Sequence, residues 1–166
     1  MTLNISPGAV EINGPLGSKV LPYPPFMSIV YSQESQSARL STQDAMVREQ
    51  RAMWGTMRAL LQNHVHGVAD GHAVVLRLVG IGYRATAERE GRMLALKLGF
   101  ANTIELEVPP AIKASCPSPT RILLESIDKN LVTQFAATIR EYRKPSPYKG
   151  KGIFIGYEQI KLKTKK

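Results

Sequence analysis

Landmark residues recur at one fixed interval along this chain, and this repetition constrains the fold more than any other feature of the sequence. A glycine, a leucine and a Pro-Pro dipeptide are each found again 85 residues later: Gly14 and Gly99, Leu21 and Leu106, Pro24-Pro25 and Pro109-Pro110. Each Pro-Pro is followed by two β-rich runs and by an aspartate that can cap a helix, Asp44 or Asp128. A single repeat of this length predicts two similar modules rather than a solenoid, which needs more repeats.

Each half is predicted to contain one helix. Apolar residues recur at three-to-four-residue steps over about residues 45–64, and we assign Trp54 in that stretch to core packing. A second apolar face runs over residues 129–142. Its helix must stop before Pro145, because a residue that precedes proline avoids the helical conformation.

Short runs rich in apolar and β-branched residues predict the strands. Such runs precede the helices at 26–31, 38–42, 111–114 and 122–126, and others occupy 72–79, 83–88, 93–98 and 103–108. Glu90-Gly91 is the expected hairpin turn among them. Each module is therefore predicted to be α+β, a small antiparallel sheet packed by one helix. We place the first module at residues 1–70, the second at 71–156 and a basic tail at 157–166.

Basic charge is concentrated at the C-terminal end. Residues 140–166 contain nine Lys/Arg and two Asp/Glu, so they carry +7 of the chain's formal +9. At the centre lies Pro145-Ser-Pro-Tyr-Lys-Gly-Lys-Gly-Ile153, in which prolines restrict the backbone and glycines allow close approach to a surface. Such a segment predicts a polyanionic partner, of which nucleic-acid phosphate is the commonest. For residues 161–166 alone, the alternative is a solvated lysine tail that serves solubility.

The composition argues against several other classes of protein. Hydrophobic residues make up 43% of the chain, enough for a core. No apolar run approaches the ~20 residues that cross a bilayer, so we expect no membrane partner. The single cysteine, Cys116, excludes an internal disulfide and is typical of a reducing compartment. The N-terminal residues lack the Arg-rich amphipathic pattern of a cleavable presequence.

Three motifs suggest small-molecule or metal chemistry, and each has a simpler interpretation. Residues 80–85 spell G-x-G-x-x-A after a strand, but a dinucleotide site needs a helix where β-patterned sequence follows here, so these glycines are expected to bend the chain. His64, His66 and His72 lack a fourth ligand for zinc. Lys149-Gly-Lys-Gly152 lacks the spacing of a Walker loop. We therefore expect no enzyme activity, cofactor, metal or small-molecule substrate, and a small dinucleotide enzyme is the weaker alternative.

Five stretches of the chain resemble the large-subunit ribosomal protein six family. They match it in order and spacing at residues 78–85, 94–99, 127–129, 136–140 and 147–153. The last stretch, Pro-Tyr-Lys-Gly-Lys-Gly-Ile, is the most specific of the five. Residues 14–17 and 54–61 resemble the family more loosely, so the resemblance extends over most of the chain.

The resemblance implies a structural component of the large ribosomal subunit without catalytic activity. Members of the family have two duplicated sheet-and-helix modules and bind large-subunit rRNA mainly through the second module and tail. They lie among other ribosomal proteins at the stalk base, near the sarcin–ricin loop where elongation factors dock. The rRNA-binding residues expected here are Arg140, Arg143, Lys144, Tyr148, Lys149, Gly150, Lys151, Gly152, Lys161 and Lys163. The alternative is a free-standing RNA-binding regulator outside the ribosome.

The chain also departs from the family pattern. Ser146 stands where glutamate is usual, and Asn102 falls where Ser-His is usual. Residues 6–10 run almost directly into Gly14, so the first sheet is expected to be shortened and to lack an opening hairpin. Residues 79–98 look most similar to mitochondrial members, which implies a mitochondrial ribosome. A bacterial cytoplasm or a plastid is the alternative.

We interpret the C-terminal segment as an rRNA-docking element that acts chiefly through phosphate contacts. A-form RNA hides its base edges in a deep, narrow groove, so a protein mainly contacts its backbone and shape. Because Gly150 and Gly152 have no side chain, the backbone at these positions is expected to lie against the sugar-phosphate chain. Tyr148 either stacks on an exposed base or packs onto Ile153 and Phe154.

Overall fold

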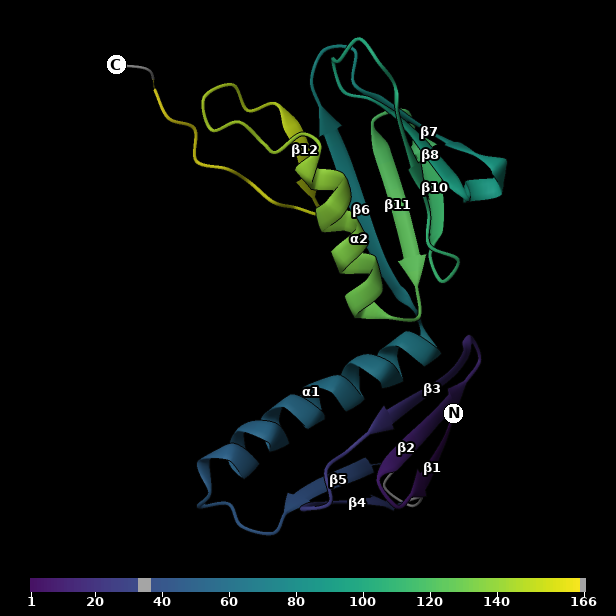
Figure 1. The fold of residues 1–166 in the computed structure, drawn as a ribbon, viewed down its shortest axis with the longest axis vertical. Helices are drawn as coiled ribbons and strands as arrows, with labels where there is room; N and C mark the ends of the chain where they lie inside the picture. The colour runs from purple at the N-terminus through teal and green to yellow at the C-terminus, as the bar shows by residue number, and fades with distance from the viewer. Residues whose placement is uncertain (33–36, 165–166) are drawn as a thin grey trace. The chain divides into compact units, whose positions relative to one another are not determined.

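The computed structural model describes residues 1–32 and 37–164, and it divides into two compact units, Met1–Gly71 and His72–Lys166. Each unit combines antiparallel strands with one long helix (Figure 1). The predicted α+β fold, with antiparallel strands and one helix in each half, is confirmed, and the strands of each unit form two sheets where one was predicted.

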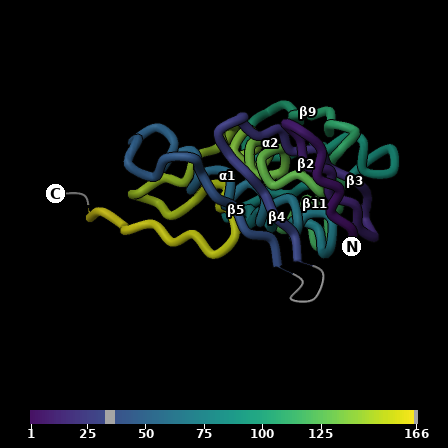
Figure 2. The backbone as a smooth tube through the Cα atoms, turned by 90° about the horizontal axis from the view of Figure 1, so that it is seen from below, coloured from purple at the N-terminus to yellow at the C-terminus, as the bar shows by residue number. Residues whose placement is uncertain are grey.

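The first unit contains two small sheets. A three-stranded antiparallel sheet has the order β1-β2-β3 and is built from Thr2–Ser6, Ala9–Gly14 and Gly17–Pro22. A separate antiparallel pair consists of β4 (Met27–Ser32) and β5 (Ser37–Thr42), which run side by side in Figure 2.

The first sheet does have an opening hairpin. β1 pairs with β2 along its whole length, from Thr2 opposite Asn13 to Ser6 opposite Ala9. Pro7 and Gly8 form the turn between them, and Gly8 adopts a φ of 85°. Proline presets one turn position and glycine accepts the positive φ of the next, so this dipeptide is well suited to a tight turn. The expectation that an opening hairpin is missing is therefore wrong.

The helix of the first unit, α1 (Arg48–Ala69), begins and ends later than predicted. Asp44 does not cap it, because the Asp44 Oδ1 atom accepts the backbone N–H of Met46 at 2.8 Å in a turn ahead of the helix. The helix ends at Ala69 with Asp70 as its cap, and the next residue, Gly71, has a φ of 79° and donates its N–H to the His66 carbonyl. A glycine in the left-handed conformation is a common helix stop, and this local signal was missed.

The C-terminal half of α1 makes the buried contacts of that helix. α1 contacts β2, β3 and β5, and its buried residues are Leu61, Gly67 and Val68. A Cβ atom at Gly14 would lie 2.5 Å from Val68 Cγ1, so β2 can approach the helix closely only because this residue is glycine. Trp54 is 39% exposed, and its indole N–H donates to the Leu40 carbonyl on β5 at 3.0 Å. The assignment of Trp54 to the core is therefore wrong.

The second unit contains a four-stranded and a three-stranded antiparallel sheet. The larger has the order β10-β11-β6-β12, formed by Lys113–Ser118, Arg121–Ser126, His72–Val79 and Gly152–Ile155. The smaller has the order β7-β8-β9, formed by Arg84–Glu88, Met93–Lys97 and Ile104–Glu107. A short 3-10 helix, η1 (Arg89–Gly91), makes the β7–β8 turn at the predicted place.

The helix of the second unit, α2 (Lys129–Glu141), ends one residue before its predicted end. Asp128 caps it as predicted, because its Oδ1 atom accepts the Asn130 N–H at 3.0 Å. The helix packs on β6, β11 and β12 (Figure 1). Its buried face consists of Val132, Ala136 and Ile139. These side chains join the main apolar core of the unit, together with Leu76, Leu94 and Ile122 among others.

The repeated landmarks of the sequence correspond to repeated structure. In chain order, β1-β2-β3, β4-β5 and α1 follow the same plan as β7-β8-β9, β10-β11 and α2. The second unit adds β6 and β12, which extend the β10-β11 pair to four strands. The basic segment between α2 and β12 is therefore held at one end by a helix whose apolar face is buried and at the other by the four-stranded sheet.

The glycine motif after β6 forms a turn. Tyr83 donates its N–H to the Gly80 carbonyl at 3.3 Å, and Gly82 has a φ of 75°. The chain then leaves the four-stranded sheet and enters β7 of the smaller one. The predicted bend is confirmed. Because a strand follows the turn, the helix N-terminus that would hold a dinucleotide pyrophosphate does not lie at this motif.

Candidate nucleic-acid interface

The segment between α2 and β12, residues 142–151, forms a closed loop, which we call the C-terminal loop. Backbone hydrogen bonds of 2.9 Å close it, from Ser146 N–H to the Lys151 carbonyl, from Gly150 N–H to the Ser146 carbonyl and from Ile153 N–H to the Arg143 carbonyl. Because these groups satisfy one another, the loop has a defined shape without any partner.

Gly152 allows this loop to close. It is buried with a φ of 147°, and a Cβ atom here would lie 2.5 Å from the Cα of Pro145. The space left by its missing side chain is therefore occupied by protein backbone. Gly152 was expected to let RNA approach the backbone, but here it lets the loop close on itself. Gly150, with a φ of 65°, lies near the Leu162 side chain of the tail, which a Cβ would meet at 3.4 Å.

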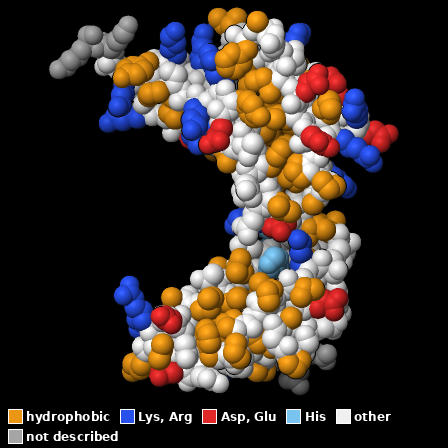
Figure 3. Space-filling model, in the orientation of Figure 1, with side chains coloured by type: hydrophobic (Ala, Val, Ile, Leu, Met, Phe, Trp, Pro, Cys, Tyr) orange, Lys and Arg blue, Asp and Glu red, His pale blue; other side chains and the backbone are white. Residues whose placement is uncertain are grey.

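Four cationic side chains of the C-terminal loop line one hollow of about 530 Å³, which we call the cationic hollow: Arg143, Lys144, Lys149 and Lys151. Ser146, Ile81, Tyr83 and Gly99 complete its lining, so the described residues that line it include no Asp or Glu. Lys and Arg side chains gather over the C-terminal part of the second unit in Figure 3. Positive charge gathered in a concave surface attracts and concentrates anions.

The tail extends the cationic surface along the loop. The Lys163 N–H donates to the Pro147 carbonyl at 2.9 Å. Lys163 also lines a second hollow, of about 460 Å³, with Ser146, Tyr148 and Lys149. Lys149 thus borders both hollows. Lys161 is exposed and lines neither.

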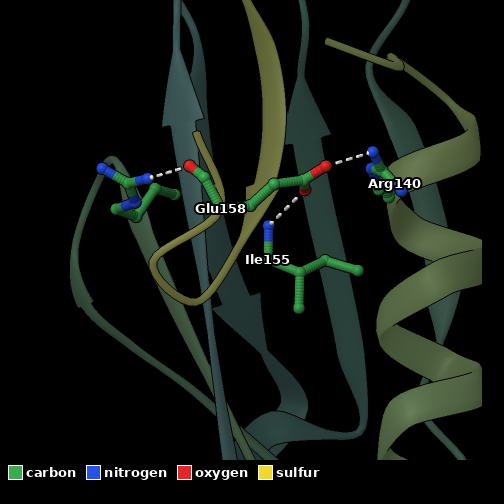
Figure 4. A network of polar contacts seen from close by, with 4 residues as sticks. Arg140, Ile155 and Glu158 are labelled. Carbon is green, nitrogen blue, oxygen red and sulfur yellow. Dashed lines mark hydrogen bonds and ion pairs between the residues drawn. The ribbon is translucent and has the colours of Figure 1, made fainter. Parts of the chain in front are cut away.

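Two of the predicted cations have acidic partners within the unit. Lys144 Nζ lies 3.7 Å from Glu141 Oε1, and because both side chains are exposed this pair is weak. Arg140 Nη2 donates to Glu158 Oε1 at 2.6 Å in a partly buried pair (Figure 4). Arg140 is therefore neutralised internally, whereas Lys144 stays available to an anion.

The turn that follows β12 is held by side chains that the sequence did not single out. Arg77 on β6 donates to the carbonyls of Gly156 and Glu158, at 3.0 and 2.9 Å. The other carboxylate oxygen of Glu158 accepts the Ile155 N–H at 3.5 Å (Figure 4). These contacts fix where the tail leaves the sheet, so the predicted tail is anchored at its first residues.

Arg143 is oriented by two aromatic residues. Its Nε donates to Tyr83 Oη at 2.9 Å, and its guanidinium carbon lies 4.9 Å from the centre of the Phe100 ring. A guanidinium held by a hydrogen bond and stacked on a ring has a restricted orientation. Tyr83 lies 60 residues away in the sequence, so neither aromatic was among the predicted site residues.

Tyr148 points its side chain into solvent. It is 62% exposed, whereas Ile153 and Phe154 are buried. Most of the Tyr148 side chain is therefore not packed against the unit. An exposed tyrosine between cations is suited to stacking on a base.

Neither hollow contains a nucleophile paired with a base. The single thiol, Cys116, lies on β10 and lines neither hollow. Burial raises the pKa of the Cys116 thiol, and a hydrogen bond with the Ala87 backbone opposes that effect only in part. The thiol is therefore protonated at neutral pH and is a weak nucleophile.

Within residues 1–32 and 37–164, neither long helix is apolar enough to cross a membrane. In the same ranges, no three His, Cys, Asp or Glu side chains gather where they could hold a metal ion.

The fold and the site define a duplicated α+β protein with an anion-attracting surface. The Ribosomal protein L6 family matches residues 79–155. The chain is 49% identical over 165 residues to large ribosomal subunit protein uL6m of Neurospora crassa, an alignment that covers 95% of this chain and 65% of that protein. It is 42% identical to uL6 of Azoarcus sp. and 39% to uL6 of Burkholderia vietnamiensis, over 99% of this chain and 90% of each relative. The chain therefore belongs to the ribosomal protein L6 family.

This membership confirms the family that the sequence motifs predicted, and the mitochondrial relative is the most similar of these three. The chain is thus a ribosomal protein of the large subunit and not an enzyme. It spans 65% of the length of the Neurospora relative and 90% of the two bacterial ones.

Proposed function

We propose that this ribosomal protein binds large-subunit rRNA through its second unit, with the C-terminal loop and the cationic hollow as the main contact surface. The observation that carries the proposal is the lining of the hollow, which includes four cations and, among the described residues, no Asp or Glu. In a ribosomal subunit the rRNA backbone is the polyanion that such a surface meets. Phosphate contacts release counterions, so binding is expected to weaken steeply with salt.

The predicted site residues divide by role in this proposal. Arg143, Lys144, Lys149 and Lys151 contact phosphates around the hollow, and Lys161 and Lys163 extend that surface along the tail. Tyr148 stacks on an exposed base. Gly150 and Gly152 shape the loop, and Arg140 positions the tail through Glu158.

A location within the subunit is part of the same proposal. The family resemblance supports a place beside the stalk base, near the sarcin–ricin loop, among neighbouring ribosomal proteins and within reach of elongation factors. We further propose a mitochondrial ribosome, because the mitochondrial relative is 49% identical and the Azoarcus relative 42% identical. A bacterial or plastid ribosome is the alternative source.

Sedimentation tests the ribosomal role. The tagged chain from a cell lysate is centrifuged through a sucrose gradient at high salt. Co-migration with the large subunit after the salt wash is the expected result, and recovery at the top of the gradient would overturn it. In that second case the free-standing RNA-binding regulator becomes the better hypothesis, and crosslinking to cellular RNA would identify its targets.

A further inference from the structure

A turn far from the C-terminal loop in sequence forms one wall of the cationic hollow. This part of the lining consists of Ile81 and Tyr83 of the β6–β7 turn and Gly99 after β8. The cations of the lining come from the C-terminal loop, more than 40 residues later in the sequence. These residues include part of the G-x-G-x-x-A motif, for which the proposed function has no role. The motif therefore belongs to the same site as the basic loop.

The glycines on this wall make room for one aromatic ring. A Cβ atom at Gly80 would lie 2.8 Å from the Tyr83 ring, and one at Gly99 would lie 3.2 Å from it. Tyr83 is consequently buried between two glycines, while its hydroxyl reaches Arg143 at 2.9 Å. The motif thus makes room for the Tyr83 ring, and Tyr83 in turn orients the Arg143 guanidinium at the hollow.

An aromatic surface remains open beside this guanidinium. Arg143 covers part of the Phe100 ring at 4.9 Å, yet Phe100 is still 47% exposed. Ile81, which lines the hollow, is 87% exposed, and Phe100 directly follows Gly99 of the same lining in sequence. Exposed aromatic and apolar groups at the edge of a cationic hollow are not explained by phosphate contacts alone, because a phosphate gains nothing from them.

We propose that the cationic hollow holds a single unpaired nucleotide of the RNA, with its phosphate among Lys144, Lys149 and Lys151 and its base stacked on the Arg143–Phe100 pair. This inference rests on the proposed function, since it assumes that the loop binds RNA. Unpaired bases are the parts of RNA that proteins stack on aromatic rings and guanidinium planes. A hollow of about 530 Å³ also falls within the usual range of small-ligand sites, roughly 300–1,000 Å³.

The test measures binding of the full chain to an in vitro transcript of the Neurospora crassa mitochondrial large-subunit rRNA over a salt series. Phe100→Ala should weaken binding by about five- to 150-fold, the range for loss of one base–aromatic stack. Its salt slope should stay unchanged because no charge is removed. Phe100→Tyr keeps a ring and should bind within about twofold of the native chain. Leu131→Ala, at a half-exposed apolar position on α2, is the control and should have no effect.

A variant with two lysine substitutions tests the nucleotide site and the proposed rRNA binding separately. If Lys149→Glu with Lys151→Glu weakens binding while Phe100→Ala does not, the nucleotide site is wrong and rRNA binding by the loop stands. If the lysine pair also binds like the native chain, the proposed function itself fails.

Ultraviolet crosslinking of the unsubstituted chain to the same transcript gives a readout that does not depend on how a variant folds. A crosslink from Phe100 or Tyr83 to a nucleotide that is unpaired in the rRNA secondary structure is expected. The absence of such a crosslink, or a crosslink only to base-paired positions, would overturn the site.

Discussion

Arg140 on α2 and Glu158 just beyond β12 form a 2.6 Å ion pair that ties the start of the tail to the helix (Figure 4). Arg77 holds the same turn from β6 through the Glu158 carbonyl. One glutamate therefore joins three elements that are distant in the sequence. As a consequence, Arg140, one of the expected rRNA-binding cations, has a structural role. The cations of the C-terminal loop lie on a loop that backbone hydrogen bonds hold in shape.

Glu158→Ala should destabilise the second unit by about 1.5–3 kcal/mol, the usual contribution of a hydrogen bond to a charged group. The loss leaves Arg140 partly buried without its carboxylate, and the Arg140 Nε is already buried without a partner. Thermal unfolding measures the change. Glu141→Ala is the matched control, because its pair with Lys144 is exposed and should contribute less than about 0.5 kcal/mol. Equal losses in the two variants would contradict a special role for Glu158.

Gly152→Ala should cost about 2 kcal/mol or more, because the added Cβ would meet the Pro145 backbone at 2.5 Å and cannot be accommodated by a side-chain movement. Gly156→Ala is the comparison, since Gly156 also has a positive φ, 56°, but no atom lies within 4 Å of its Cβ position. Its expected cost is the conformational one alone, about 1–2 kcal/mol. Chemical denaturation of both variants tests this, and a smaller loss at Gly152 would refute the contact.

Lys149→Glu together with Lys151→Glu should weaken rRNA binding far more than Lys165→Glu together with Lys166→Glu. The first pair lies in the cationic hollow. Removing two phosphate contacts should flatten the salt dependence by about 1.8 in slope, on the duplex scale of about 0.9 per contact. Filter binding at several salt concentrations measures both quantities. Equal losses from the two pairs would mean that the segment acts only as diffuse positive charge.

Tyr148→Ala should reduce rRNA affinity by about 1–3 kcal/mol if the ring stacks on a base. Because the side chain is mostly exposed, the free energy of unfolding should change by less than about 0.5 kcal/mol. A binding titration and a thermal melt on the same sample separate the two effects. A stable variant with native affinity would show that Tyr148 makes no stacking contact.

Cys116 should make the second unit less stable as the pH rises. Burial raises the pKa of the folded thiol above its unfolded value, so the folded state holds this proton more tightly. The resulting stabilisation is complete below the unfolded pKa, about 8.5, and is lost as the pH rises through the folded pKa. Denaturation of the native chain and of Cys116→Ser from neutral to alkaline pH should show this loss only in the native chain. Parallel curves would contradict it.

Local signals predicted much of the fold. α2 was placed to within one residue because its cap, Asp128, and its stop, the approach to Pro145, are adjacent to it in the sequence. β6 was predicted over its observed span, since apolar and β-branched residues fill it. The start of α1 was misplaced because Asp44 could cap either a helix or a turn, and only the folded chain shows the turn.

The sequence by itself determined the duplicated α+β plan, the family and the position of the basic segment, because these depend on residue order and local pattern. Only the tertiary structure decided how the cations are used. Arg140 and Arg143 lie three positions apart, and nothing local distinguishes them. Packing of β12 and its turn against α2 brings Glu158 to Arg140, whereas the β6–β7 turn brings Tyr83 to Arg143. Such contacts join residues far apart in sequence, so they arise from the packing of whole elements and have no local sequence signature.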